Sequence, residues 1–171
     1  MIDAIVYNSK SGHTLTYAKE LALRLGLPIY TIRKAKRKLK RQSNIIFMSW
    51  VCEDKIVGYD KVLRFHIDTV IACGIYPVDE EMISRVKNEN IIYSKFFYLR
   101  GGINISKLGL RKKIALKAIE NRLDFKLKDS GLIRADQSAL DAIVNQKDYT
   151  DLNSLDPIVA IFDDGQPNFV A

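Results

Sequence analysis

Cysteine, proline and glycine are scarce in this sequence of 171 residues, which contains two, four and nine of them. Two cysteines, Cys52 and Cys73, are too few for a disulfide framework, and no group of histidine and cysteine has the spacing of a zinc site. With 47% hydrophobic and 27% charged residues, the composition excludes a disordered or fibrous chain. We therefore expect a folded protein without structural metal, forming one compact domain over residues 1–171.

Long hydrophobic runs are also missing. The longest stretch free of both charge and strongly polar residues, Thr69 to Val78, has about half of the roughly 20 residues that cross a bilayer. The N-terminus MIDAIVYNSK has an acid where a signal peptide has basic residues. These absences predict a cytoplasmic protein.

Positive charge dominates, with a net charge of +7, and it is concentrated. Residues 33–41 contain seven basic residues and no acid, and residues 95–126 contain nine basic residues and two acids. Most such runs are solvated faces; the alternative is a surface for a redox partner protein or an anionic membrane. Nucleic acid is not the partner that we expect.

Short apolar segments alternate with helical patterns along the chain. The strand-like segments are residues 2–7, 28–32, 45–48, 69–74 and 96–99. Helices are expected over residues 14–25, 59–66, 79–88, 108–123, 136–144 and 152–162, whereas the connection 33–41 is too short for a full-length helix. This alternation predicts a three-layer α/β fold, whose ligand sits at the carboxyl ends of the strands.

The loop after the first predicted strand is suited to binding a phosphate. Its six residues include three hydroxyls, a glycine and no acid: Ser9, Lys10, Ser11, Gly12, His13 and Thr14. Gly12 permits a positive φ, and backbone N–H groups converge at the start of the following helix. The simpler interpretation is a helix cap. The loop matches neither the G-x-x-x-x-G-K-[ST] loop nor the G-x-G-x-x-G turn.

Three segments resemble a known family. IVYNSKSGHTLTYAKELA looks like the start of flavodoxin-like proteins, whose first loop, [ST]-x-[ST]-G-x-T, holds the phosphate of FMN. NIIFMSWVCEDKIVGYDKV is similar to their third strand and the loop that follows it. FFYLRGGINISKLGLRKKIALKAI resembles the fifth strand and helix of bacterial flavodoxin-domain proteins, whose core is distantly similar to menaquinone-dependent protoporphyrinogen oxidase. The resemblance implies a flavodoxin-like fold, a five-stranded parallel sheet in the order 2-1-3-4-5, and noncovalently bound FMN.

The resemblance also places two loops around the flavin ring. They contain Ser49, Trp50, Val51 and Cys52 after the third strand, and Gly74, Ile75 and Tyr76 after the fourth. Trp50 and Tyr76 would stack on the ring, or fill ordinary half-buried positions. Cys52 and Cys73 form a redox pair in one interpretation and are small buried hydrophobes in the other, which we favour.

The chain departs from flavodoxin carriers in being basic, so docking through acidic residues around the flavin is not expected. The helix over 107–122 is expected to pack on the sheet, or alternatively to lie on an anionic membrane. Three functions follow: an FMN-binding protein mediating electron transfer, a quinone- or NAD(P)H-linked flavin oxidoreductase, or a non-redox binding module that uses its basic face.

Overall fold

The computed structural model describes residues 1–107, 109–129 and 134–163. Its sheet has the order β2-β1-β3-β5-β6, with each neighbouring pair parallel. The strands are β1 (Ala4–Asn8), β2 (Ile29–Thr31), β3 (Asn44–Cys52), β5 (His66–Gly74) and β6 (Lys95–Arg100). A two-residue strand, β4 (Lys55–Ile56), pairs antiparallel with β3 off this path. With β4 set aside, the order is 2-1-3-4-5, which confirms the flavodoxin-like α/β fold.

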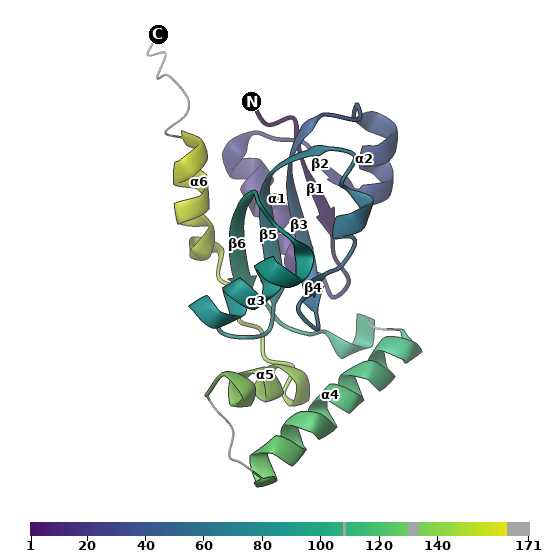
Figure 1. Cartoon of the computed structure of the whole chain (residues 1–171), viewed down its shortest axis with the longest axis vertical. Coiled ribbons are helices and arrows are strands. Elements are labelled where there is room, and N and C mark those ends of the chain that lie inside the picture. The colour runs from purple at the N-terminus through teal and green to yellow at the C-terminus, as the bar shows by residue number, and fades with distance from the viewer. Residues whose placement is uncertain (108, 130–133, 164–171) are drawn as a thin grey trace.

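Helices cover both faces of the sheet (Figure 1). The helices α1 (His13–Leu25) and α6 (Asp156–Asp163) lie on one face, and α2 (Ile32–Lys38) and α3 (Glu80–Asn90) on the other. Successive strand residues point to opposite faces, so Ile46 packs under α1 while Phe47 packs under α2 and α3. Burial on both faces explains the continuous apolar runs of the central strands.

Strand β3 is longer than the sequence predicted, and this changes the loop after it. Residues 49–52, expected as a loop, continue the strand as far as Cys52. The chain then reverses at Glu53 and Asp54, whose φ angles of 49° and 62° are those of a tight hairpin turn. Pairing of β3 with β5 ends at Trp50, and the next two residues, Val51 and Cys52, pair with Ile56 and Lys55 of β4 instead.

One helix prediction for this half of the chain is confirmed and another was wrong. The connection 33–41, expected to be too short for a full-length helix, contributes only to the two-turn helix α2, whose N-cap residue Thr31 accepts a hydrogen bond from the Lys34 N–H with its side chain at 3.3 Å. Residues 59–66, expected as a helix, form only a three-residue 3₁₀ helix, Tyr59–Lys61, and His66 already belongs to β5. Because His66 pairs with Asn44 of β3, the sheet takes up the end of the predicted helix.

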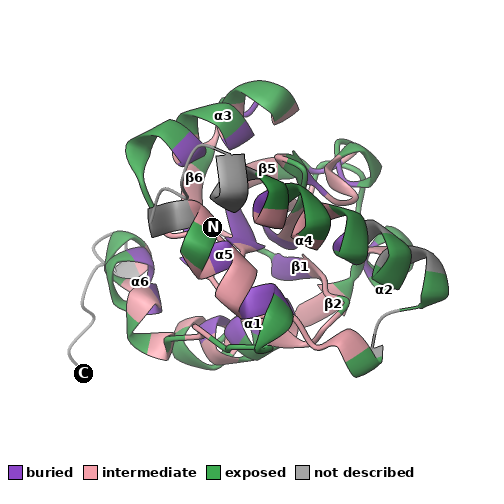
Figure 2. Ribbon diagram, turned by 90° about the horizontal axis from the view of Figure 1, so that it is seen from below, coloured by how far each residue is buried: buried purple, intermediate pink, exposed green. Residues whose placement is uncertain are grey.

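The largest departure concerns the helix after the last strand. We expected it to pack on the sheet; instead α4 (Leu110–Asp129) crosses below the carboxyl ends of the strands and pairs with α5 (Arg134–Val144). Figure 2, which views the molecule from below, shows α4 and α5 in front of the strands. Leu108, the expected first residue of this helix, lies outside the described residues. The place on the sheet is taken by α6 and the 3₁₀ helix before it (Leu152–Leu155), where Ile158 and Leu155 are buried against α1.

The apolar side chains of α4 explain this position. Leu116 and Leu123 are buried against Ala139 and Ile143 of α5 and against the loops that follow β5 and β6. Together α4 and α5 form a hairpin that covers the edge of the sheet where a ligand is expected. Among the described residues, no helix is both long enough and apolar enough to span a membrane.

Candidate functional site

A cavity of about 450 Å³ lies between the carboxyl ends of the strands and the α4–α5 hairpin. Its walls come from the loop after β1, the end of β3, the segments after β5 and β6, and helices α3 and α4. Ten of the thirteen predicted site residues line it: Lys10, Ser11, His13, Thr14, Trp50, Val51, Cys52, Gly74, Ile75 and Tyr76. The fold therefore brings three separate predicted segments to one place, as parallel strands do at a shared edge.

The other three predicted residues lie elsewhere. Ser49 is buried inside β3, and its hydroxyl donates to the Val57 carbonyl at 2.6 Å, because the strand continues past it. Ser9 and Gly12 border a second, neighbouring cavity instead. The loop after β1 thus separates two cavities, and Lys10 lines both of them.

The start of α1 forms the end of the larger cavity that is suited to binding a phosphate. Gly12 precedes the helix with a φ of 111°, a conformation that L side chains rarely adopt, and it provides no side-chain cap. The first turn of α1 contains no acidic residue. Its N–H groups and the positive end of the helix dipole are therefore suited to an anion. Thr14, 2% exposed, adds a hydroxyl, while the Ser11 hydroxyl makes a long hydrogen bond of 3.5 Å to the Gly102 carbonyl.

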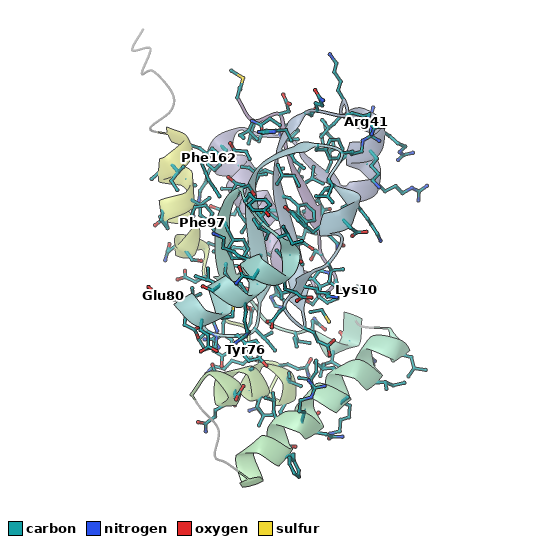
Figure 3. All side chains as sticks on the ribbon, viewed as in Figure 1. Lys10, Arg41, Tyr76, Glu80, Phe97 and Phe162 are labelled. Atoms are coloured by element: carbon teal, nitrogen blue, oxygen red, sulfur yellow. The ribbon has the colours of Figure 1, made fainter. Side chains whose placement is uncertain are left out.

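Aromatic rings form the other end of the cavity. Trp50 at the end of β3 and Tyr76 after β5 both line it, as does Tyr98 of β6, which is not among the predicted site residues. In Figure 3, Tyr76 lies at the lower edge of the sheet, next to the hairpin. A side chain on Gly74 would overlap the Tyr98 hydroxyl, so Gly74 leaves room for this ring. Burial raises the pKa of both tyrosines, so both phenols are neutral at physiological pH.

The two cysteines differ in environment. Cys73 is buried, and this burial raises the pKa of its thiol to about 12, although a hydrogen bond with the Thr14 side chain acts in the opposite direction. Cys52 is exposed at the end of β3. Both border the cavity, but the Cys73 thiol is neutral at pH 7, which disfavours nucleophilic or redox chemistry at that sulfur.

A histidine and an aspartate meet beside the start of α1. His13 Nδ1 lies 3.2 Å from both the Asp148 carboxylate and the Thr150 hydroxyl, while its Nε2 is buried without a partner among the described residues. Burial, the largest effect, raises the pKa of Asp148, but hydrogen bonds from Thr150 and the nearby His13 outweigh it and leave the pKa low. No sequence pattern points to this segment, because Asp148 is 135 positions from His13.

The segment that holds Asp148 is fixed to α1 and β6. The Asp151 N–H donates to the Tyr17 hydroxyl at 2.9 Å, and this hydroxyl donates to the Arg100 carbonyl at 2.6 Å. The Arg100 guanidinium stacks on Tyr149, 3.6 Å from its ring centre, and donates to Ser138 of α5. These contacts join the hairpin, the segment after it and β6 into one wall of the site.

Charged side chains also reach the cavity on the hairpin side. Arg85 of α3 forms an ion pair with Asp54 at 3.1 Å, and Arg122 of α4 and Asp136 of α5 lie on the same lining. The described residues contain no group of three metal-ligating side chains placed to hold an ion. The cavity thus combines an end that is suited to an anion, an apolar and aromatic middle, and two arginines near the cover.

The residues present fit FMN on two independent observations. The uncapped start of α1, with the partnerless Nε2 of His13 beside it, suits a phosphate, and the ring-lined end suits a planar heteroaromatic group. The Asp148 carboxylate near the phosphate end opposes a dianion, but its interaction with His13 reduces this repulsion.

The fold and this site define a doubly wound α/β protein with a ligand cavity at the carboxyl edge of its sheet. No family model matches the chain, and no curated protein is significantly similar to it. Among solved structures, it is similar to a flavodoxin from the domain Archaea, with 10% sequence identity and a TM-score of 0.35. That match covers 85% of this chain and 98% of the flavodoxin.

Proposed function

We propose that this chain binds FMN in the larger cavity and exchanges electrons through it. The observation that supports this most is the cavity itself, where the start of α1 faces the same space as Trp50, Tyr76 and Tyr98. A bound flavin supplies the redox chemistry, and the protein supplies binding, orientation and the surrounding field.

In this proposal each part of the cavity has a role. The first-turn N–H groups of α1, with Thr14 and Lys10, hold the phosphate. Trp50 and Tyr76 pack against the ring, and Tyr98 fixes the position of the segment after β5 through a hydrogen bond with the Tyr76 backbone. No adenosine-binding turn follows the loop, so we expect FMN rather than FAD.

The α4–α5 hairpin supports a second candidate, an oxidoreductase that acts on a small molecule. A carrier that passes electrons to proteins must present its flavin at the surface, whereas here the hairpin encloses the site with Leu116, Ile119 and Leu123 on its inner side. An apolar cover with Arg122 at its border is suited to a small electron donor or acceptor, such as a quinone or NAD(P)H. Steady-state turnover with these compounds distinguishes the enzyme from the carrier.

The first experiment identifies the cofactor. The purified protein is reconstituted with FMN, with FAD and with riboflavin, and binding is followed by quenching of flavin fluorescence. We expect tight binding of FMN, weaker binding of riboflavin because it lacks the phosphate, and release on heating of a compound that co-migrates with FMN. Preference for FAD, or failure to bind any flavin, contradicts the proposal.

The second experiment tests the phosphate end with a matched pair of threonines on α1. Thr14→Ala removes a hydroxyl from the cavity, and we expect FMN binding to weaken by about 1–3 kcal/mol, the scale of a hydrogen bond to a charged group. Thr16 is exposed, and its hydroxyl donates to the Gly12 carbonyl, so Thr16→Ala is the control. The weakening should disappear with riboflavin; equal effects of both variants would reduce the loop to a helix cap.

A further inference from the structure

The outer side of α4 carries a second apolar face, opposite the one that covers the cavity. Leu116 and Leu123 on the inner side are buried, whereas Leu110, Ile114 and Phe125 are 75%, 63% and 70% exposed. At 3.6 residues per turn, these three exposed side chains fall within about 60° of one another around the helix, roughly opposite the two leucines. We call them the outer stripe. Large apolar side chains gathered in this way at a surface mark a place where a partner binds.

We propose that the outer stripe docks on the surface of an anionic lipid bilayer, with α4 lying parallel to that surface. Leu110 and Phe125 are 15 positions apart, which corresponds to about 22 Å along a helix. A row of that length on a convex helix fits a planar surface, where its side chains insert at the level of the headgroups. Figure 1 shows α4 at the end of the molecule, beyond the carboxyl ends of the strands, where a flat surface can approach it.

The charges beside the stripe favour anionic lipid. Among the α4 side chains that the structure describes, the exposed charged ones are Lys113, Lys117 and Arg122, all of them basic. The acids in that part of the helix are only partly exposed, and one of them, Glu120, is paired with Lys117 at 2.6 Å. Residues 107–117 contain five basic residues and no acid. Basic side chains beside an inserted apolar row are attracted to the negative surface potential of such a bilayer.

A second copy of this chain fits the outer stripe less well. Pairing two copies of α4 through the stripe would bring their lysines together, on molecules that each have a net charge of +7, and like charges repel. The proposal is also independent of the flavin, because Leu110, Ile114 and Phe125 do not line the cavity, whereas Leu116 and Leu123 do. Flavin-free protein can therefore be used to test it.

Flotation with lipid vesicles tests the apolar part of the proposal. The vesicles contain either phosphatidylcholine alone or equal parts of phosphatidylcholine and phosphatidylglycerol, and we expect binding to the anionic vesicles that weakens as salt is added. The double variant Ile114→Ala/Phe125→Ala should weaken this binding about tenfold, because it removes the inserted side chains. The control, Leu23→Ala/Tyr93→Ala, shortens two exposed apolar side chains outside α4 and should change binding less than about twofold.

A matched pair of charge variants tests the basic part. Lys113→Gln/Lys117→Gln should weaken binding to the anionic vesicles about tenfold, and Lys36→Gln/Lys40→Gln, which removes the same charge from the other basic segment, less than about twofold.

Three outcomes would overturn the proposal. They are no binding to the anionic vesicles, equal effects of the variants and their controls, and a dimer in sedimentation velocity that Ile114→Ala/Phe125→Ala dissociates. Because no flavin is present, a chain that binds no FMN can still pass this test, and one that binds FMN can still fail it.

Discussion

Position 74 requires glycine because Tyr98 occupies the space that a side chain would take. A Cβ at this position would overlap the Tyr98 hydroxyl and come within 2.8 Å of Cζ of the ring, and the ring is held by packing in the core and by the Tyr76 backbone. Overpacking of this kind costs about 1–3 kcal/mol. We therefore expect Gly74→Ala to lower the free energy of unfolding by that amount, as measured by urea denaturation.

The matching second change is Tyr98→Phe. It removes the oxygen that overlaps first, so the double variant Gly74→Ala/Tyr98→Phe should recover part of the stability lost in Gly74→Ala. Purely additive losses would show that the ring is not what excludes a side chain at position 74.

The Cys73 thiol provides a prediction on pH. Its pKa is raised from 9.0 to about 12 by burial, so the folded protein keeps this proton where the unfolded chain loses it. A raised pKa stabilises the fold fully below pH 9, and this contribution falls as pH rises from 9 to 12, by about 1.4 kcal/mol per pH unit. We expect urea denaturation to show a smaller loss over this range in Cys73→Ala than in the parent protein.

Alkylation offers an independent measurement of the same thiol. At pH 8, iodoacetamide should modify the exposed Cys52 in the folded protein and leave Cys73 unmodified, as read by mass spectrometry. Reaction of both thiols at equal rates without denaturant would contradict the burial of Cys73.

At the scale of elements, the α4–α5 hairpin depends on a few buried leucines. Leu123 is 3% exposed and packs against α5, whereas Ile114 on the same helix is 63% exposed. We expect Leu123→Ala to lower the free energy of local opening by about 2–3 kcal/mol, because it leaves a cavity between the two helices. Hydrogen exchange should then be faster in α4 and α5 but unchanged in β1, β3 and β5.

Ile114→Ala is the control, since it removes a similar side chain from the surface and should leave exchange unchanged. If Leu123→Ala instead speeds exchange throughout the sheet, the hairpin and the sheet unfold as one unit rather than separately.

At the scale of the whole molecule, the net charge of +7 is concentrated on α2 and the residues after it. The segment starts at the carboxyl end of β2, on the ligand side of the sheet, but α2 leads away from it: Figure 3 shows Arg41 at the opposite end of the sheet from Lys10. Long-range attraction acts on the approach of a partner, so α2 need not border the cavity to steer one. We propose an acidic redox protein as that partner.

Charge reversal tests this proposal. Replacing Lys36, Arg37 and Lys40 by Glu should slow reduction by an acidic donor protein about tenfold at low salt, with little change in FMN affinity. The control reverses three dispersed and exposed lysines, Lys19, Lys61 and Lys113, which gives the same net charge. Stopped-flow rates that respond equally to both variants, or not at all to salt, would leave α2 as a solvated helix.

The sequence alone determined the core of this fold. Alternating β-rich and helical segments follow from local periodicity, which each segment expresses by itself, so the positions of most strands and of α1, α3 and α5 could be predicted. The same alternation brings the loops after β1 and β5 to one edge, which is why most predicted site residues line one cavity.

Only the tertiary structure decided what surrounds that edge. The periodicity of residues 108–123 shows that this helix has an apolar face, but not whether the sheet or α5 buries it. That choice depends on α6 and the 3₁₀ helix before it, which occupy the sheet through Ile158 and Leu155. The extension of β3 likewise depends on pairing with β4, and the meeting of His13 with Asp148 on a chain reversal through two helices. The local sequence pattern predicts which face of an element is apolar and must be buried. Which other element packs against that face depends on contacts between residues far apart in the sequence.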